Sequence, residues 1–391
     1  MSILDSAREA GPALAASDAD SARLGYLSDE AWAQLQRIGV LRALQPKRWG
    51  GGEVPFAEYL ATIVEIGRHS PAAGWVASVV GVHPWQIALF DERAQAELWG
   101  DDPALVIASS YTPTGKVEAV EGGFAVSGRW SFSSGSHHAD AIILGGIAGT
   151  REFDGREYGD FTSVVVAKGD YTIDQTWNTA GLRGTGSNDV VVDNVFVPAY
   201  RAQSHLDYTH GLGTPLPGQA VNDGPLYRLP WAVVFGAIIS AAAVGAAKGF
   251  LDRWTAETRN RRTNYGGVLR DEPVVQNHLA KAAWAVDAAE LKLRRAATEL
   301  TAAAEAGAVP GKEERAFYRW DVAHAAQVAV DEIVSLMRTA SGRAAYVDHP
   351  LHRAYQDVMA AIGHAFLVEE PLGNAFAGRR LGSGNLPEVH L

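Results

Sequence analysis

Three short segments of the chain combine hydroxyl side chains with aromatic rings, a mixture that suits a flat ligand with a polar edge. They are Trp130–Gly135, Ser109–Tyr111, and the glycine-rich Gly181–Ser187, which follows Trp177. A flavin ring needs apolar or aromatic faces around it and hydroxyl or backbone donors along its N5–O4 edge. Each segment alone is better explained as a turn between strands. Composition and spacing therefore indicate a flavin only weakly.

Other kinds of chemical site find no support in the sequence motifs. The glycines of Gly181–Ser187 do not follow GxGxxG, and the segment precedes a predicted strand, so no nicotinamide or phosphate loop is predicted. His137 and His138 are adjacent and cannot form the helical i,i+4 pair that metal sites favour, and we expect them at the surface after the Trp130–Gly135 turn. There is no GxSxG nucleophile elbow and no cysteine. We therefore predict no metal, thiolate or disulfide chemistry.

The composition is that of a large soluble globular protein. The chain has 391 residues, which predicts two or three packed domains. Its formal net charge of -11 disfavours a nucleic-acid partner, because phosphate binding needs a basic surface. The acidic N-terminal segment does not resemble a signal peptide. We expect a cytoplasmic protein.

The texture of the sequence changes twice along the chain and predicts an α+β fold. We predict a helical domain over residues 1–105, an antiparallel β domain over 106–215, and a helical bundle over 216–391. The predicted helices are Ser28–Ile38, Val64–Ala73, Asp91–Trp99, Asn277–Ala306, Ala316–Ser341 and Arg353–Val368. The predicted strands are Lys116–Val120, Gly123–Ser127, Ala141–Leu144, Ser163–Val166 and Val190–Val197.

Two further segments need a separate interpretation. Residues 203–230 form a long irregular run rich in Gly and Pro, which predicts either a lid over a binding site or an ordered crossover between domains. The segment Trp231–Ala247 is apolar, but it is short for a membrane span and rich in Ala, Gly and Ser. We expect it to be a buried helix at a helix or subunit interface.

Three motifs, in this order, resemble the acyl-CoA dehydrogenase superfamily over nearly the whole chain. Trp130–Gly135, WSFSSG, resembles the segment that meets the flavin N5 edge. Gly181–Pro198, GLRGTGSNDVVVDNVFVP, is similar to the Gly-x-Arg-x-Thr-x-Ser segment and its following strand. Arg262–Gly266, with Gln276 downstream, resembles the block whose Arg reaches the flavin phosphate of a neighbouring subunit. The resemblance implies a helical domain, a β domain and a C-terminal four-helix bundle that forms a homotetramer.

Within the superfamily, the sequence is closer to the oxygenase components of two-component flavin-dependent monooxygenases. The segments Leu44–Gly51, Gly74–Phe90 and Ser109–Gly115 carry this resemblance. It points to the phenolic secosteroid hydroxylases of bacterial steroid degradation, and more distantly to 4-hydroxyphenylacetate hydroxylase oxygenases and dibenzothiophene monooxygenases. The chain departs from the dehydrogenases in the stretch Arg353–Phe366, where the expected catalytic Glu-Gly-Thr is missing and His364 stands near its place.

The resemblance implies the role of each candidate residue. Reduced flavin, FADH2 or FMNH2, would react with O2 to give a C4a-hydroperoxyflavin that hydroxylates an aromatic, phenolic substrate. Ser134 or Ser133 would bond N5, His364 would support the peroxide, and His83 would take the phenol proton. Ser110 and Tyr111 are candidates for the substrate pocket. The remaining candidates for flavin binding are Trp130, Trp177, Arg183, Thr185, Ser187, Arg262 and Tyr265.

Several alternatives remain open at the level of sequence. His83 is also explained as a core histidine, His364 as an interface residue, and Arg262 as part of a solvated helix end. The whole chain is also compatible with an acyl-CoA dehydrogenase that has a relocated base, with a non-catalytic flavin-binding protein, or with S- or N-oxygenation. Because the chain has no nicotinamide motif, an oxygenase of this kind needs a separate NAD(P)H:flavin reductase.

Overall fold

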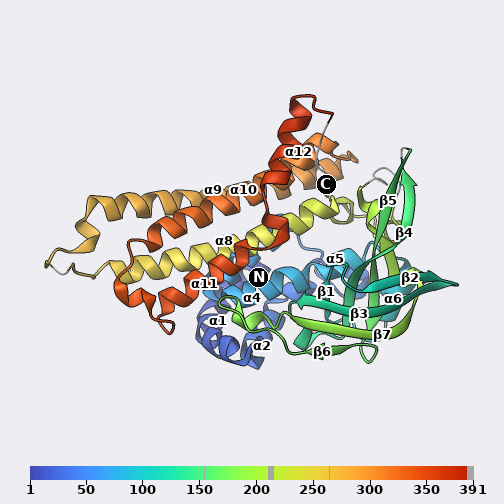
Figure 1. Ribbon diagram of the computed structural model, residues 1–391, viewed down its shortest axis with the longest axis horizontal. Helices are drawn as coiled ribbons and strands as arrows, with labels where there is room; N and C mark the ends of the chain where they lie inside the picture. The colour runs from blue at the N-terminus through green and yellow to red at the C-terminus, as the bar shows by residue number, and fades with distance from the viewer. Residues whose placement is uncertain (154, 210–214, 264, 385–391) are drawn as a thin grey trace.

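The predicted α+β fold is confirmed by the computed structural model, which describes residues 1–153, 155–209, 215–263 and 265–384. Helices come first, a β region follows, and a long helical bundle ends the chain (Figure 1). The bundle and the β region lie at opposite ends of the longest axis, with the N-terminal helices beneath them in this view.

Six helices precede the β region. They are α1 (Ile3–Leu24), α2 (Asp29–Ile38), α3 (Phe56–His69), α4 (Pro71–Gly81), α5 (His83–Ile87) and α6 (Glu92–Trp99). The predicted helix over Val64–Ala73, with an end near Pro71, is interrupted at Ser70, whose extended conformation separates α3 from α4. Its hydroxyl accepts a hydrogen bond from the Ala73 amide, and Pro71 fits the first turn of α4. Helix α4, which begins after this break, carries Trp75.

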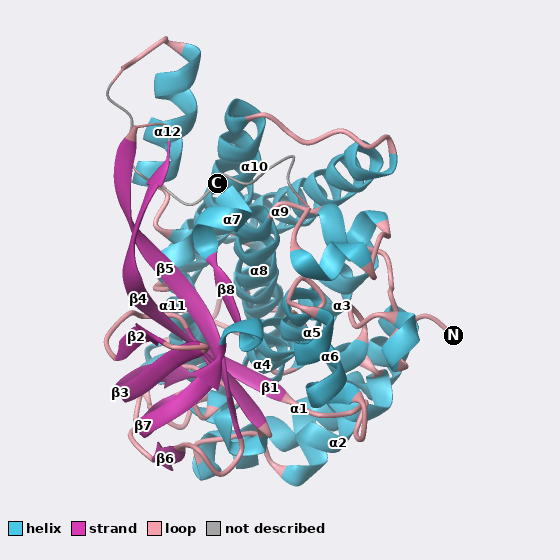
Figure 2. Ribbon diagram, turned by 90° about the vertical axis from the view of Figure 1, so that its right-hand side faces the viewer, coloured by secondary structure: helices cyan, strands magenta, loops and turns pink. Residues whose placement is uncertain are grey.

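The β region consists of two four-stranded sheets, with strand orders β1-β4-β5-β8 and β2-β3-β7-β6 (Figure 2). The strands are β1 (Ile107–Ser110), β2 (Lys116–Val120), β3 (Gly123–Ser133), β4 (Ala141–Phe153), β5 (Arg156–Ala167), β6 (Thr172–Asp174), β7 (Asn188–Pro198) and β8 (Ala202–Ser204). The expectation of a purely antiparallel region needs one correction, because β1 and β4 pair in parallel. The chain leaves the first sheet after β1 to form β2 and β3 in the second sheet, and it returns at β4 in the same direction as β1.

Four long helices form the C-terminal bundle: α8 (Trp231–Thr258), α9 (Pro273–Glu305), α10 (Lys312–Met337) and α11 (Pro350–Ile362). Two shorter helices are α7 (His205–Thr209) and α12 (Glu370–Arg380), and α12 projects from the bundle in Figure 1. The helix predicted over Arg353–Val368 ends earlier, at Ile362. His364 therefore lies in a turn after α11 and not within a helix.

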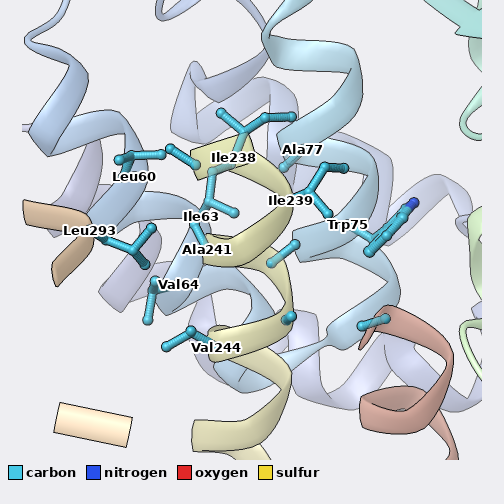
Figure 3. Close-up of a cluster of buried hydrophobic side chains, with 14 of the residues drawn as sticks. Leu60, Ile63, Val64, Trp75, Ala77, Ile238, Ile239, Ala241, Val244 and Leu293 are labelled. Atoms are coloured by element: carbon cyan, nitrogen blue, oxygen red, sulfur yellow. The ribbon is translucent and has the colours of Figure 1, made fainter. Parts of the chain in front are cut away.

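Helix α8 is the centre of the hydrophobic core. It is long and apolar enough to cross a membrane, but 94% of its most apolar window is buried inside the protein. Figure 3 shows Ile238, Ile239, Ala241 and Val244 of α8 packed among side chains of α3, α4 and α9. A Cβ atom on Gly245 would lie 2.7 Å from the carbonyl oxygen of Val64, so only glycine permits this approach of α8 to α3. The predicted buried helix is confirmed, and Trp75 of α4 lies at the edge of this core (Figure 3).

Candidate active site

A row of hydroxyl groups joins the two predicted flavin segments. The Ser134 hydroxyl lies 2.7 Å from that of Ser187, which lies 2.7 Å from that of Thr185. Thr185 donates to the carbonyl oxygen of Leu182 over 3.0 Å, and the indole N–H of Trp75 donates to Ser134 over 3.1 Å. Since the Thr185 hydroxyl donates to a carbonyl, it must accept from Ser187, and Ser187 must accept from Ser134. The structure thus brings three predicted residues together and adds Trp75, which the candidate set had omitted.

Two aromatic rings stand beside this row. Phe132 and Trp177 pack edge to face with their centroids 6.2 Å apart, and Phe132 is 67% exposed. Phe132 has a left-handed backbone, with φ of 67°, at an irregularity in the pairing of β3 with β7. This irregularity turns the Phe132 side chain outward although Trp130 faces inward, against the usual period-2 alternation of a strand. Phe132 and Trp177 therefore offer aromatic faces for a flat ligand.

Trp130 needs a correction as a flavin contact. Its ring is fully buried in the hydrophobic core between the sheets, and its N–H donates to the Gly145 carbonyl over 2.8 Å. Gly115 leaves room for it, because a Cβ there would lie 2.1 Å from the ring. We therefore assign Trp130 to the core of the β region.

Helix α11 fixes the glycine-rich loop that carries Thr185 and Ser187. Leu182 has a left-handed backbone, with φ of 49°, and its amide donates to the Asp357 carboxylate over 2.7 Å. A Cβ on Gly181 would lie only 1.9 Å from the Gln356 carbonyl oxygen, so the loop backbone lies directly on the helix. Burial, reinforced by the negative charge of Asp18, raises the pKa of Asp357 to about 7. Asp357 was not among the predicted site residues, although it lies in the stretch Arg353–Phe366, where the sequence departs from the dehydrogenases.

The three other predicted flavin residues lie at the surface. Arg183 is exposed, at the edge of the hydroxyl row. Arg262 and Tyr265 lie in the connection between α8 and α9, where Arg262 donates to the Gly266 carbonyl and Tyr265 is 100% exposed. Figure 1 shows this connection at the end of the molecule opposite the β region, so neither residue reaches the hydroxyl row of its own chain.

His364 lies beside Trp75, with ring centroids 5.6 Å apart. Its Nδ1 atom accepts a hydrogen bond from the Phe366 amide over 3.1 Å, which caps the short turn Ala365–Leu367. Burial, and secondarily the positive charge of Arg319, lowers the pKa of His364 to about 4. The neutral ring must then carry its proton on Nε2. His364 is therefore a neutral hydrogen-bond donor next to the hydroxyl row.

His83 has the opposite tautomer. Its Nδ1 atom lies 2.6 Å from the Ile107 carbonyl oxygen, so Nδ1 carries the proton and Nε2 keeps a lone pair. The side chain is 1% exposed, and Nε2 has no hydrogen-bond partner in the described part of the chain. Burial lowers the pKa of His83 to about 4. His83 is thus a neutral, unpaired hydrogen-bond acceptor in an apolar setting.

A series of aromatic rings connects the two histidines. Phe366 lies 5.9 Å from His364 and 5.9 Å from Trp231, measured between ring centroids. Trp231 is 5.9 Å from Tyr111, which is 6.4 Å from His83. Tyr111 is the only one of these bridging rings that the sequence candidates included. Trp231 and Phe366 were missed, because nothing in their local sequence shows that they lie together.

The predicted serines Ser110 and Ser133 are both buried near the turn after β3. The Ser110 hydroxyl donates to the Ser131 carbonyl over 2.6 Å. The Ser133 hydroxyl has no partner within the residues that the structure describes. An unpaired buried hydroxyl next to Ser134 is consistent with a ligand edge at this position.

Comparisons with known proteins agree with this geometry. Residues 237–369 match the family model described as Acyl-CoA dehydrogenase, C-terminal domain. The oxygenase subunit HsaA, a flavin-dependent monooxygenase of Rhodococcus jostii (strain RHA1), is 36% identical over 344 residues, or 88% of each chain. The oxygenase component of the FADH(2)-dependent resorcinol hydroxylase of Rhizobium sp. (strain MTP-10005) is 31% identical, over 90% of this chain and 87% of the relative.

The solved structures give the same result. The crystal structure of 3-HSA hydroxylase from Rhodococcus sp. RHA1 superimposes with a TM-score of 0.91 at 32% sequence identity, and the match covers 100% of this chain and 98% of that one. The predicted resemblance is confirmed: the chain belongs to the oxygenase components of flavin-dependent monooxygenases, which share the acyl-CoA dehydrogenase fold.

Proposed function

We propose that this protein uses reduced flavin and O2 to hydroxylate an aromatic, phenolic substrate. One observation carries the proposal: the site holds two neutral histidines of opposite tautomer, with a donor at His364 and an acceptor at His83. The series of aromatic side chains between them, which includes Tyr111, Trp231 and Phe366, supplies an apolar enclosure for the substrate. The relatives named as oxygenase subunits support this assignment.

The residues around the hydroxyl row fit a flavin. Phe132 and Trp177 offer faces, Ser133 and Ser134 offer hydroxyls to one edge, and exposed Arg183 offers a charge to the phosphate end. Reduced flavin, when bound, supplies the electrons that activate O2. Arg262 and Tyr265 support flavin binding in a neighbouring subunit, since they lie far from the hydroxyl row of their own chain.

His83 and His364 would divide the work on protons. The Nε2 lone pair of His83 accepts the proton of the substrate hydroxyl, which raises the electron density of the aromatic ring. The Nε2–H of His364 donates a hydrogen bond to oxygen at the flavin edge, and the aromatic lining excludes water that would waste the activated oxygen. Both residues are neutral before the substrate reacts, because burial lowers each pKa to about 4.

The structure disfavours the dehydrogenase alternative at this site. Removal of an α-proton needs an available carboxylate, but two carboxylates near the turn after α11 have other partners. Asp357 accepts the Leu182 amide, and Glu369 pairs with His324 at 2.5 Å. The two neutral histidines suit oxygen chemistry better.

A product screen tests the proposal. The purified protein, a generic flavin reductase, NADH and a panel of phenols should give catechol-type products by mass spectrometry. Bleaching of the oxidised flavin complex by an acyl-CoA, with no hydroxylated product from any phenol, would instead establish the dehydrogenase.

We further propose a homotetramer and a separate reductase partner. A separate reductase delivers reduced flavin by diffusion, and four copies associate through the bundle in the cytoplasm. Exposed apolar side chains on α9 support the association, among them Val274, Trp284 and Leu291.

A further inference from the structure

Two polar groups near His83 are buried without a hydrogen-bond partner among the described residues. They are the side-chain amide nitrogen of Gln86 and the hydroxyl of Tyr208. Gln86 is 0% exposed and Tyr208 is 4% exposed. Because proteins rarely leave buried donors unpaired, these groups indicate a ligand that is bound during function.

Gln86 lies on the same side of helix α5 as His83. The two residues are three positions apart, which places their side chains on one helix face. The Tyr111 hydroxyl donates to Oε1 of Gln86, while the Tyr111 ring lies 6.4 Å from that of His83. This hydrogen bond fixes the orientation of the Gln86 amide, whose Nε2 group has N–H donors left to offer.

Tyr208 of helix α7 brings its hydroxyl near the Gln86 amide and the Tyr111 hydroxyl. The nearby Tyr111 hydroxyl raises the pKa of Tyr208, after the larger effect of burial, and the Gln86 amide opposes this rise. The Gln86 amide group and the Tyr208 hydroxyl are therefore close, although no hydrogen bond of good geometry joins them. The Tyr208 ring stacks on Trp231 with centroids 5.7 Å apart, so it belongs to the aromatic enclosure that links the histidines.

The charge around these two donors favours a neutral ligand group over an acidic one. Burial is the main cause that raises the pKa of Tyr208, so its phenol remains protonated and donates. The Asp207 carboxylate is paired with Arg151 at 3.0 Å, and Arg319 lies over the ring of Phe366, on the His364 side of the enclosure. Two donors without a cation beside them suit a neutral oxygen better than a carboxylate.

We propose that Gln86 and Tyr208 form a second polar subsite that binds a neutral carbonyl or hydroxyl oxygen of the substrate, remote from its phenolic hydroxyl. This inference rests on the proposed phenol hydroxylation and adds a second point of attachment. His83 accepts from the phenol, and the subsite holds the other end of the substrate. Two fixed ends determine which ring carbon faces the flavin.

Binding of three matched phenols to the purified full-length protein tests the subsite. The probes are 4-(4-hydroxyphenyl)butan-2-one, its alkyl analogue 4-butylphenol, and 3-(4-hydroxyphenyl)propanoate, with affinities measured by isothermal titration calorimetry. The wild-type protein should bind the ketone most tightly. Tyr208→Phe and Gln86→Leu should each weaken ketone binding about tenfold and leave 4-butylphenol unchanged, as expected for one lost hydrogen bond.

Tyr227→Phe is the matched control, because it removes another buried hydroxyl, one that bonds the Leu44 carbonyl outside the enclosure. It should leave all three affinities unchanged. Equal weakening of ketone and alkyl phenol, equal wild-type affinity for ketone and carboxylate, or no binding of the ketone would each overturn the subsite. Hydroxylation of 4-butylphenol is scored separately: if it proceeds without ketone discrimination, the proposed function stands and the subsite falls. If the ketone binds through Tyr208 but no phenol is hydroxylated, the proposed function falls alone.

Discussion

The two histidines of the site differ in which ring nitrogen is occupied by the protein. His83 donates from Nδ1 to the Ile107 carbonyl, and His364 accepts at Nδ1 from the Phe366 amide. The same free atom, Nε2, is therefore an acceptor in one residue and a donor in the other. This difference supports the proposed roles, deprotonation of the substrate by His83 and support of oxygen by His364, and it allows variants that separate catalysis from structure.

For His83, the informative change is to Asn, which keeps an N–H near the position of Nδ1 and removes Nε2. We expect NADH oxidation with the reductase to continue while the yield of hydroxylated product falls by about a hundredfold or more, the lower end of the range for loss of a general base. Product and hydrogen peroxide are measured per NADH consumed. A product yield equal to that of the wild type would show that His83 is only a core residue.

For His364, a matched control lies at the start of α11. His349 caps that helix by accepting from the Leu351 amide over 3.2 Å, in the same way that His364 caps its turn over 3.1 Å. His364→Asn keeps a capping acceptor but loses the Nε2 donor, and we expect it to release more hydrogen peroxide per NADH. His349→Ala should lower thermal stability without changing that ratio. If both variants change only stability, His364 is a cap alone.

At the scale of elements, helix α11 positions the glycine-rich loop Gly181–Ser187 through Asp357. The negative charge of this buried carboxylate lowers the stability of the folded protein. Its pKa is raised to about 7, so the folded protein binds a proton that the unfolded chain, with an Asp pKa of about 4, has released. Between these values, stability rises as pH falls. The histidines have the opposite sign: their pKa values of about 4 lie below the unfolded value of about 6.5, so their contribution is lost as pH falls through this interval.

Asp357→Asn should therefore remove the gain in stability on acidification and leave the opposite effect of the two histidines. The amide oxygen still accepts from Leu182, so the loop conformation is retained. Denaturant unfolding between pH 7 and pH 4 should show a loss of stability on acidification steeper than that of the wild type, by up to about 1.4 kcal/mol per pH unit. Identical slopes for the two proteins would show that folding does not raise the pKa of Asp357.

At the scale of the whole molecule, the proposed flavin site is shared between chains. Arg262 and Tyr265 lie in the α8–α9 connection, at the end of the molecule opposite the β region, and Trp284 is 68% exposed on α9. In the proposed tetramer, a neighbouring copy would cover Trp284, and its Arg262 would serve the flavin site of this chain. Assembly and flavin binding should therefore be linked.

Two variants separate this link into its parts. Trp284→Lys should dissociate the assembly, as measured by light scattering after size-exclusion chromatography, and it should weaken the binding of reduced flavin. Arg262→Ala should weaken flavin binding about tenfold and leave the assembly intact, because it removes one charge-assisted contact to phosphate. Normal flavin affinity in a Trp284→Lys monomer would contradict a shared site.

Sequence patterns were sufficient for features that depend on neighbours along the chain. The period of apolar residues predicted the helical and β regions, the Ser28 cap and Gly39 marked the ends of α2, and the apolar run from Trp231 marked the buried helix. These signals work because capping and side-chain periodicity act over a few residues. The grouping of Ser134, Thr185 and Ser187 came instead from the resemblance to the acyl-CoA dehydrogenase superfamily.

Only the tertiary structure decided the properties that depend on contacts between distant segments. The tautomer of His83 depends on a carbonyl 24 residues away, and the partner of Ser134 is Trp75, 59 residues away. The outward turn of Phe132 depends on an irregularity in strand pairing that no local pattern shows. Residue types and their order thus determined the class of chemistry, while burial and long-range hydrogen bonds determined which nitrogen carries each proton.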